Sequence, residues 1–256
     1  MEARKYNNTV TMARRCLILS KRNPDTFFSS VMLPALMMML FVALFGNLVH
    51  VGNTSYVNYI VPGVLLQCIG QCSSTTAIMM NRDVTSGMAG RFCTLPVRKI
   101  SILSGHVLEA SVRCLFTSGI VILAAMLVGF RPAASPVGWG LIFILLAGVI
   151  LAMSWLAVIV GLIADSAEGA SALSSLAIVL PYLSSGFVPA ESLPAVLRGF
   201  AQYQPMTPVI DAMRSILLGG TWDLRALVAG FIWCAALMGG FHVAAVVMFK
   251  KRLAAI

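Results

Sequence analysis

Six long apolar runs, separated by short polar segments, dominate the chain. They are Phe27–Val49, Val57–Met80, Val107–Gly129, Val137–Ala164, Ala170–Val188 and Ala226–Phe249. Because a bilayer core about 30 Å thick needs roughly 20 apolar residues in an α-helix, each run predicts one membrane-spanning helix. The first run is too long for the apolar part of a secretion signal and follows 26 mostly polar residues, so we interpret it as a true span.

The third run is charged only near its start, where Glu109 and Arg113 stand one helical turn apart. Side chains at this spacing lie on the same face of a helix. We therefore expect a local ion pair here rather than a proton relay.

The composition excludes an ordinary soluble enzyme. Of the 256 residues, 59% are hydrophobic and 11% are charged, whereas a soluble domain is roughly half apolar and about a quarter charged. The six cysteines form no CxxC pair, so neither a disulfide framework nor a zinc site is expected. The predicted fold class is all-α integral membrane, with residues 1–256 as a single transmembrane domain.

The positive charges predict the orientation, because Lys and Arg near span ends tend to stay in the cytoplasm. Most of them lie before the first run, after the second or after the last: Arg4, Lys5, Arg14, Arg15, Lys21, Arg22, Arg82, Arg91, Arg98, Lys99, Lys250, Lys251 and Arg252. Both termini should therefore be cytoplasmic. The short segment Asp165–Glu168 has no Lys or Arg and gives no help. Topology accounts for most of the net charge of +9, and no nucleic-acid-reading motif accompanies it, so nucleic acid is not an expected partner.

The segment Asn8–Arg22 places Val10, Ala13 and Leu17 at helical spacing among basic residues. This pattern predicts an amphipathic helix on the inner leaflet before the first span, in contact with membrane lipid. A simple basic anchor that fixes the topology is the alternative.

Two polar segments are longer than connectors. The cytoplasmic segment 81–106 predicts a short helix over Val84–Cys93 and a turn at Thr94–Pro96, with an inert basic loop as the alternative. The outer segment 189–225 is divided by prolines. Its stretches Val196–Tyr203 and Val209–Leu218 are amphipathic but too short to span, so they predict helices that lie on or dip into the outer boundary.

Gln67 and Gln71 stand one helical turn apart in the second run, and the polar face continues from Ser73 to Thr76. Such a face should point into the bundle, either lining a substrate path or making hydrogen bonds between helices. Catalytic and nucleotide-binding patterns are missing: HExxH, GxSxG and GxxxxGK[ST] do not occur. If ATP drives this protein, we expect another polypeptide to bind it.

Several motifs resemble the daunorubicin-resistance group of ABC-2 type transporter permeases. Around the cytoplasmic loop these are Arg82-Asp83, Ser86-Gly87-Met88, Arg91-Phe92 and Thr94-Leu95-Pro96. Around the outer segment they are Ser184 to Pro189, Gln204 to Val209, Ala212-Met213-Arg214 and Leu217 to Gly220. The resemblance covers nearly the whole chain. It departs at Gly90, Cys93 and His106, where the group more often has an acid, a basic residue and Arg; these positions bear on which ATPase is recognised.

The resemblance implies a permease subunit in a bacterial plasma membrane that works with two copies of an ABC ATP-binding subunit and a second permease, identical or related. ATP and Mg would be bound by the ATPase, with no catalytic residue, cofactor or metal in this chain. The residues expected to couple to the ATPase are Arg82, Asp83, Gly87, Met88, Arg91, Phe92, Thr94, Leu95 and Pro96. Those expected to form an outer gate are Ser184, Ser185, Phe187, Pro189, Gln204, Pro205, Thr207, Pro208 and Arg214. Gln67 and Gln71 are the candidate pathway residues.

The cargo implied is an amphiphilic drug, antibiotic or lipid moved outward. Export of a polysaccharide or glycolipid is the alternative within the family. An intramembrane lipid-modifying enzyme and a passive channel are alternatives of other classes. The enzyme would need converging acid, base or metal ligands at membrane depth, and the sequence does not reveal them.

Overall fold

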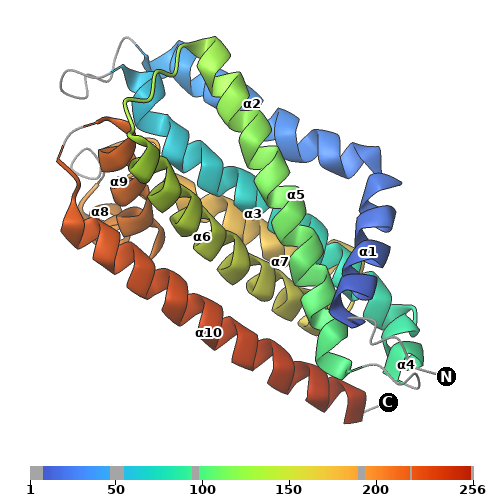
Figure 1. Ribbon diagram of the computed structural model, residues 1–256. Coiled ribbons are helices and arrows are strands. Elements are labelled where there is room, and N and C mark those ends of the chain that lie inside the picture. The colour runs from blue at the N-terminus through green and yellow to red at the C-terminus, as the bar shows by residue number, and fades with distance from the viewer. Residues whose placement is uncertain (1–7, 47–54, 94–97, 190–193, 220, 255–256) are drawn as a thin grey trace.

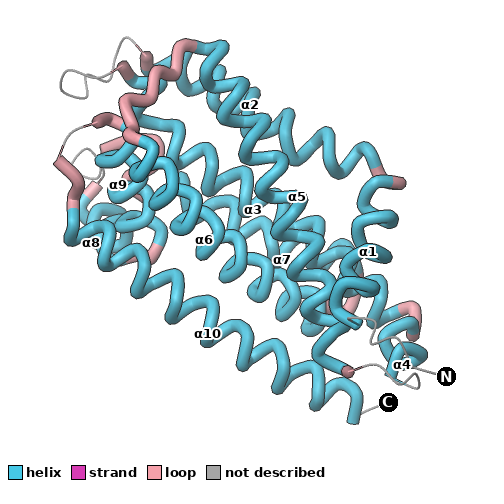
Figure 2. The backbone as a smooth tube through the Cα atoms, in the orientation of Figure 1, coloured by secondary structure: helices cyan, strands magenta, loops and turns pink. Residues whose placement is uncertain are grey.

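The computed structural model describes residues 8–46, 55–93, 98–189, 194–219 and 221–254, which form helices joined by short connections (Figures 1 and 2). Within these segments no strand occurs. The elements in chain order are α1 (Asn8–Lys21), α2 (Pro24–Phe45), α3 (Tyr56–Thr85), α4 (Met88–Cys93), α5 (Lys99–Val128), α6 (Pro136–Ile163), α7 (Ala167–Val179), the 3-10 turn η1 (Leu180–Leu183), α8 (Ala195–Tyr203), α9 (Met206–Leu217) and α10 (Leu224–Ala254). The all-α prediction is confirmed for this part of the chain.

Local sequence signals explain several helix ends. Ser135 precedes α6 and accepts a hydrogen bond from the amide of Gly138 at 3.2 Å. Ser166 precedes α7 and accepts one from the amide of Gly169 at 3.0 Å. Both side chains thus satisfy an amide that has no partner within its helix. At the C-terminal end of α5, Gly129 adopts a φ of 111° and terminates the helix.

Four helices in the described segments are long and apolar enough to cross a bilayer: Phe28–Phe45, Lys99–Val128, Pro136–Ile163 and Leu224–Arg252. α3 has the length, with 30 residues, but its hydropathy is lowered by the polar stretch from Gln67 to Thr76 and by the charges near its end. α7 has 13 residues, and with η1 it forms a shorter apolar helix over Ala167–Leu183. Six spans therefore stay a prediction.

α3 is the centre of the bundle. It packs against α2, α5, α6 and α7, and its side chains Ile60, Val64 and Ile69 are fully buried. α10 lies along α6 on the outside, and α1 packs on α5 (Figure 1). The start of α1, the end of α10 and α4 lie at one end of the bundle, which we name the α4 end. α8 and α9 lie at the opposite end, the α9 end (Figure 1).

Glycines allow other elements to approach α3 closely. A Cβ atom added at Gly63 would lie 2.7 Å from the carbonyl oxygen of Gly186, and one added at Gly161 would lie 2.6 Å from that of Ala77. Small residues at helix contacts let backbones come together, which is a common way to pack helices in membranes. Gly63 thereby lets the turn after η1 pack closely on α3, and Gly161 lets α6 do the same.

The predicted short helix over Val84–Cys93 is corrected by the structure. Val84 and Thr85 complete the last turn of α3, and Gly87, with a φ of 74°, separates α3 from α4. Glycine adopts this left-handed conformation without the steric cost of a Cβ. The short helix therefore starts at Met88.

The polar loop predicted over 81–106 is also shorter in the structure. α5 begins at Lys99, so the residues up to His106 form its first two turns. Ile102 and Leu103 are buried in a cluster with Met80 and Trp155. Burial of these apolar side chains stabilises the first two turns of α5, although the local sequence is polar.

The run Ala170–Val188 is helical over a shorter stretch than the sequence predicts. α7 begins at Ala167 and ends at Val179, and η1 follows. Pro181 within η1 has no amide hydrogen and cannot continue an α-helix without loss of a hydrogen bond. From Ser184 onward the chain turns across the α9 end of the bundle.

Candidate functional site

Asp83, in the last turn of α3, joins three helices at the α4 end. Arg15 of α1 donates two hydrogen bonds to its carboxylate, from Nη1 to Oδ2 at 2.6 Å and from Nη2 to Oδ1 at 2.8 Å. His106 of α5 donates a third, from Nε2 to Oδ2 at 3.1 Å. A paired, two-pronged contact between guanidinium and carboxylate is among the stronger polar contacts in proteins. Asp83 therefore ties α1 and α5 to the end of α3.

Burial and charge set the ionisation of this cluster. Burial acts to raise the pKa of Asp83, but the hydrogen bonds from Arg15 and His106 outweigh it and hold that pKa below its ordinary value. The hydrogen bond to Asp83 in turn raises the pKa of Arg15. Both side chains are thus charged at neutral pH. Asp83 is 7% exposed, and its carboxylate is engaged by Arg15 and His106; the ATPase contact expected from the sequence stays a prediction.

α1 is held along α5 by close packing. A Cβ atom added at Gly105 would lie 2.6 Å from the Cβ of Met12, and Cys16 Sγ lies 3.7 Å from His106 Nδ1. The opposite face of α1 exposes Val10 and Ile18. The segment predicted as an amphipathic helix is therefore helical, with one apolar face on the protein and another free for lipid.

α4 lies between the ends of α3 and α5. Met88 at its start is partly buried and Arg91 is exposed. Among the described residues, a Cβ atom added at Gly90 would meet no other atom within 4 Å. The predicted coupling residues Thr94, Leu95 and Pro96 lie outside the described residues, as does the side chain of Phe92.

A second polar cluster links α5 to α3 deeper in the bundle. Arg113 Nε donates to Glu109 Oε1 at 2.8 Å. Its Nη1 and Nη2 donate to the carbonyl oxygen of Cys72 at 3.1 Å and to Thr76 Oγ1 at 2.7 Å. Glu109 is 0% exposed and Arg113 5%. The expected local ion pair is confirmed, and it also fastens α5 to α3.

At the α9 end, the structure brings Ser185 and Arg214 of the predicted outer gate together. Ser185 Oγ donates to Asp211 Oδ1 at 2.7 Å, and its carbonyl oxygen accepts hydrogen bonds from Tyr59 Oη, at 2.9 Å, and from Arg214. Arg214 also donates to Asp211 at 2.8 Å, and its guanidinium carbon lies 3.8 Å from the centroid of the Tyr59 ring. These contacts join the turn after η1, the start of α3 and α9. We name this cluster of residues at the α9 end the cap.

Aromatic rings complete this cap. Phe187 packs between Phe41 and Tyr182, with ring centroids 4.9 and 4.5 Å away. Tyr56 Oη donates to the carbonyl oxygen of Phe187 at 2.8 Å. Ser184 Oγ accepts from the amide of Gly186 at 3.0 Å and so shapes the turn. These rings pack on one another, so the apolar part of the cap is filled.

The remaining residues of the predicted gate lie around α8 and α9. Pro205 precedes α9, and Pro208 is in its first turn. Thr207 Oγ1 donates to the carbonyl oxygen of Ala201 in α8. Gln204 is buried, and neither polar atom of its side chain has a partner among the described residues. Pro189 ends the described part of the preceding segment.

The cap also contains functional candidates that the sequence reasoning missed. Tyr56 and Tyr59 stand three residues apart at the start of α3, and Asp211 stands three residues before Arg214. This i,i+3 spacing was a usable signal for a shared helix face. Their link to residues 184–187 had no such signal, because more than 100 residues separate Tyr56 and Tyr59 from their partners there.

The candidate pathway residues Gln67 and Gln71 lie in the middle of α3. Gln67 is 1% exposed, and the side-chain oxygens of both residues have no hydrogen-bond partner among the described residues. Their role in a path stays a prediction. Across the described segments no group of three or more His, Cys, Asp or Glu side chains is arranged to hold a metal ion.

A bundle of apolar helices, with a short helix held at one end and a polar and aromatic cap at the other, defines a multi-span membrane protein. A family model described as ABC-2 type transporter matches residues 7–218. The chain therefore belongs to the ABC-2 type transporter family, whose members are transport subunits.

Two relatives of this chain are drug-resistance permeases. The chain is 25% identical over 231 residues to the daunorubicin resistance ABC transporter permease protein DrrB1 of Streptomyces coeruleorubidus, which covers 89% of this chain and 80% of that protein. It is 27% identical over 233 residues to the probable doxorubicin resistance ABC transporter permease protein DrrC of Mycobacterium tuberculosis, covering 90% of this chain and 83% of that one. The predicted resemblance to drug-resistance permeases is confirmed.

Proposed function

We propose that this chain is the permease subunit of an ATP-driven exporter that moves an amphiphilic drug, antibiotic or lipid out of a bacterial cell. The observation that carries this proposal is α4, a helix of six residues placed at the end of the bundle between α3 and α5. A separate ABC ATP-binding subunit would press on α4 from the cytoplasm. In this proposal two permeases and two ATP-binding subunits make the working transporter.

α3 is the element that carries the motion across the membrane. From Tyr59 in the cap to Asp83 beside α4 it is one continuous helix, about 36 Å long at 1.5 Å per residue. Asp83 and the Glu109–Arg113 pair fasten α1 and α5 to it. A push on α4 would therefore move α3 and α5 together and act on the cap through Tyr59. In this scheme Asp83 positions α4 and does not itself touch the ATPase.

The relatives support the choice of cargo. Both are described as drug-resistance permeases, and daunorubicin and doxorubicin are the drugs in their names. An apolar cavity of about 290 Å³ between α6 and α7, with Ser73 and Ser174 as its polar groups, is suited to part of an amphiphilic molecule.

The test replaces Arg91 and Phe92 with Ala together. Membrane vesicles that contain the permease and its ATPase should then show loss of drug transport and loss of drug-stimulated ATP hydrolysis, while the permease still inserts. Arg98→Ala is the matched control, because Arg98 is also exposed but precedes α5 and is not in α4. Unchanged transport in the double variant would overturn the coupling role of α4.

A further inference from the structure

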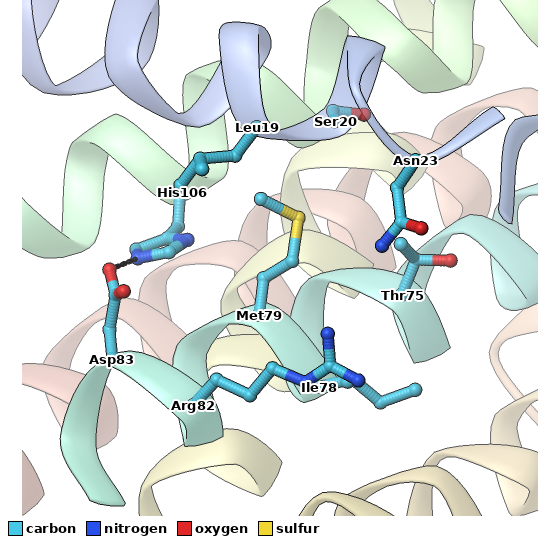
Figure 3. A pocket seen from close by; sticks show the side chains of 9 residues that line it. All are labelled: Leu19, Ser20, Asn23, Thr75, Ile78, Met79, Arg82, Asp83 and His106. Atoms are coloured by element: carbon cyan, nitrogen blue, oxygen red, sulfur yellow. Dashed lines mark hydrogen bonds and ion pairs between the residues drawn. The ribbon is translucent and has the colours of Figure 1, made fainter. Parts of the chain in front are cut away.

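A cavity of about 240 Å³ lies at the corner between α1 and α2, against α3. It is lined by Leu19, Ser20, Asn23, Thr75, Ile78, Met79, Arg82, Asp83 and His106 (Figure 3). The polar side chains surround Met79, which lies at the centre (Figure 3). We propose that this cavity binds the phosphate-bearing headgroup of a membrane phospholipid.

Arg82 provides the positive charge. Its guanidinium extends from α3 towards the side of the cavity on which Asn23 and Thr75 lie (Figure 3). Among the described residues the Arg82 side chain makes no ion pair. A guanidinium donates paired hydrogen bonds to phosphate oxygens, and amide and hydroxyl groups add further donors. Arg82 with Asn23 and Thr75 therefore forms a set of donors for a phosphate.

The carboxylate of Asp83 does not oppose an anion here. Its two oxygens accept hydrogen bonds from Arg15 and His106, so its charge is balanced within the protein. The exposed basic side chain of Lys21, which follows the lining residue Ser20 at the end of α1, adds to the positive potential around the cavity. The net field therefore favours a negatively charged headgroup.

The place of the cavity favours a lipid over the transported cargo. Its volume is below the roughly 300–1,000 Å³ of sites for whole drug-sized molecules, so it would hold a headgroup and not a whole lipid. Leu19 lines it and is also 41% exposed, so acyl chains outside the cavity would continue along the apolar face of α1. The bound lipid would fill the corner between α1 and α3. This site does not depend on which cargo is transported or in which direction.

The experiment titrates phosphatidylglycerol into the purified full-length chain in detergent and counts bound lipid by native mass spectrometry. Diacylglycerol, which has no phosphate, and inorganic phosphate, which has no acyl chains, are the comparison probes. We expect one tightly bound phosphatidylglycerol, weak binding of diacylglycerol, and no displacement by millimolar inorganic phosphate. Displacement by inorganic phosphate, or equal binding of diacylglycerol, would overturn the assignment to a lipid-borne phosphate.

Three variants test the residues. Arg82→Gln should weaken phosphatidylglycerol binding by about tenfold or more, because one charged hydrogen-bond donor is lost. Ser20→Phe should weaken it by filling the cavity while Arg82 is retained. Arg14→Gln removes an equal charge from α1 outside the cavity and should leave binding unchanged. Circular dichroism checks that each variant is helical. Wild-type binding in both Arg82→Gln and Ser20→Phe would exclude this cavity as the site.

Discussion

Asp83 contacts two helices that are distant from it in sequence, and its partners explain why it is buried. An isolated buried carboxylate is costly, but one that receives three hydrogen bonds from basic side chains is stable. A neutral amide in its place would give Arg15 and His106 one acceptor oxygen in place of two and no opposing negative charge. The effect should therefore exceed that of an exposed acid.

Asp83→Asn is expected to lower the free energy of unfolding by about 2 kcal/mol or more at pH 7. The sign of the pH dependence follows from the lowered pKa of Asp83. A carboxylate with a lowered pKa stabilises the fold at and above its ordinary titration range, and this contribution is lost as the pH falls below it. The difference between variant and wild type should thus be present at pH 7 and shrink in strong acid.

Thermal unfolding in detergent, followed by circular dichroism at several pH values, measures this difference. Asp165→Asn is the matched control, because Asp165 is an exposed acid and the described residues give it no ion pair. A melting temperature of Asp83→Asn equal to that of the control at pH 7 would contradict the role given to Asp83.

The ion pairs Glu109–Arg113 and Arg15–Asp83 also show what residue spacing can predict. Glu109 and Arg113 were predictable as a pair, because four residues along a helix bring side chains together. Arg15 and Asp83 are 68 residues apart, and no periodicity of the sequence connects them. Their contact arises only when α1 packs on α5 beside the end of α3.

At the scale of elements, the apolar runs predicted where helices lie but not where they end. The α3–α4 boundary depends on the positive φ of Gly87, and the first turns of α5 depend on burial of Ile102 and Leu103. Tertiary contacts of this kind outweigh local polarity, which is why a window of hydropathy misplaces such boundaries. The close contacts of Gly63 with Gly186 and of Gly161 with Ala77 likewise depend on how the helices pack.

Gly63→Ala is expected to disturb the cap at the α9 end. The added methyl group would lie 2.7 to 2.9 Å from the backbone of Gly186, so α3 and the turn after η1 would have to separate. Overpacking of this kind costs about 1–3 kcal/mol. Thermal unfolding should show the loss, and drug transport should fall with it if the cap is the outer gate.

Gly119→Ala provides the control for this change. Gly119 is also inside a long helix, α5, but a Cβ atom there would meet none of the described atoms within 4 Å. Because Ala favours a helix more than Gly does, this variant should be as stable as wild type or slightly more stable. Equal stability of both variants would show that the contact between Gly63 and Gly186 is not as close as described.

At the scale of the whole molecule, the connection between α6 and α7 shows which helix ends lie at the α4 end of the bundle. The sequence left this segment without a preference, because it contains no Lys or Arg. In the structure, Asn81 Nδ2 near the end of α3 donates to the carbonyl oxygen of Ala164 at 2.6 Å, and Arg252 of α10 donates to that of Leu162. Asp165 therefore lies at the α4 end, beside the basic segments predicted to be cytoplasmic.

Asp223 lies at the opposite end, since its amide donates to Ser215 Oγ of α9 at 3.2 Å. If six helices cross the membrane with α4 in the cytoplasm, a cysteine at position 223 should react with a membrane-impermeant maleimide in intact cells. A cysteine at position 165 should react only after permeabilisation. The background variant would be Cys93→Ser, because the cysteines at positions 16, 68, 72, 114 and 234 are buried.

This pair of sites tests the topology because α7, η1, α8 and α9 are the elements that lie between them. α6 is apolar enough to cross on its own, as is α10, whereas α7 with η1 is short. If α7 did not cross, positions 165 and 223 would lie on the same side of the membrane, and both would react, or both would fail to react, in intact cells. Labelling of 223 alone requires the segment from α7 to α9 to return the chain across the bilayer. Labelling of 165 alone would reverse the orientation and place α4 outside, where no ATP-binding subunit could reach it.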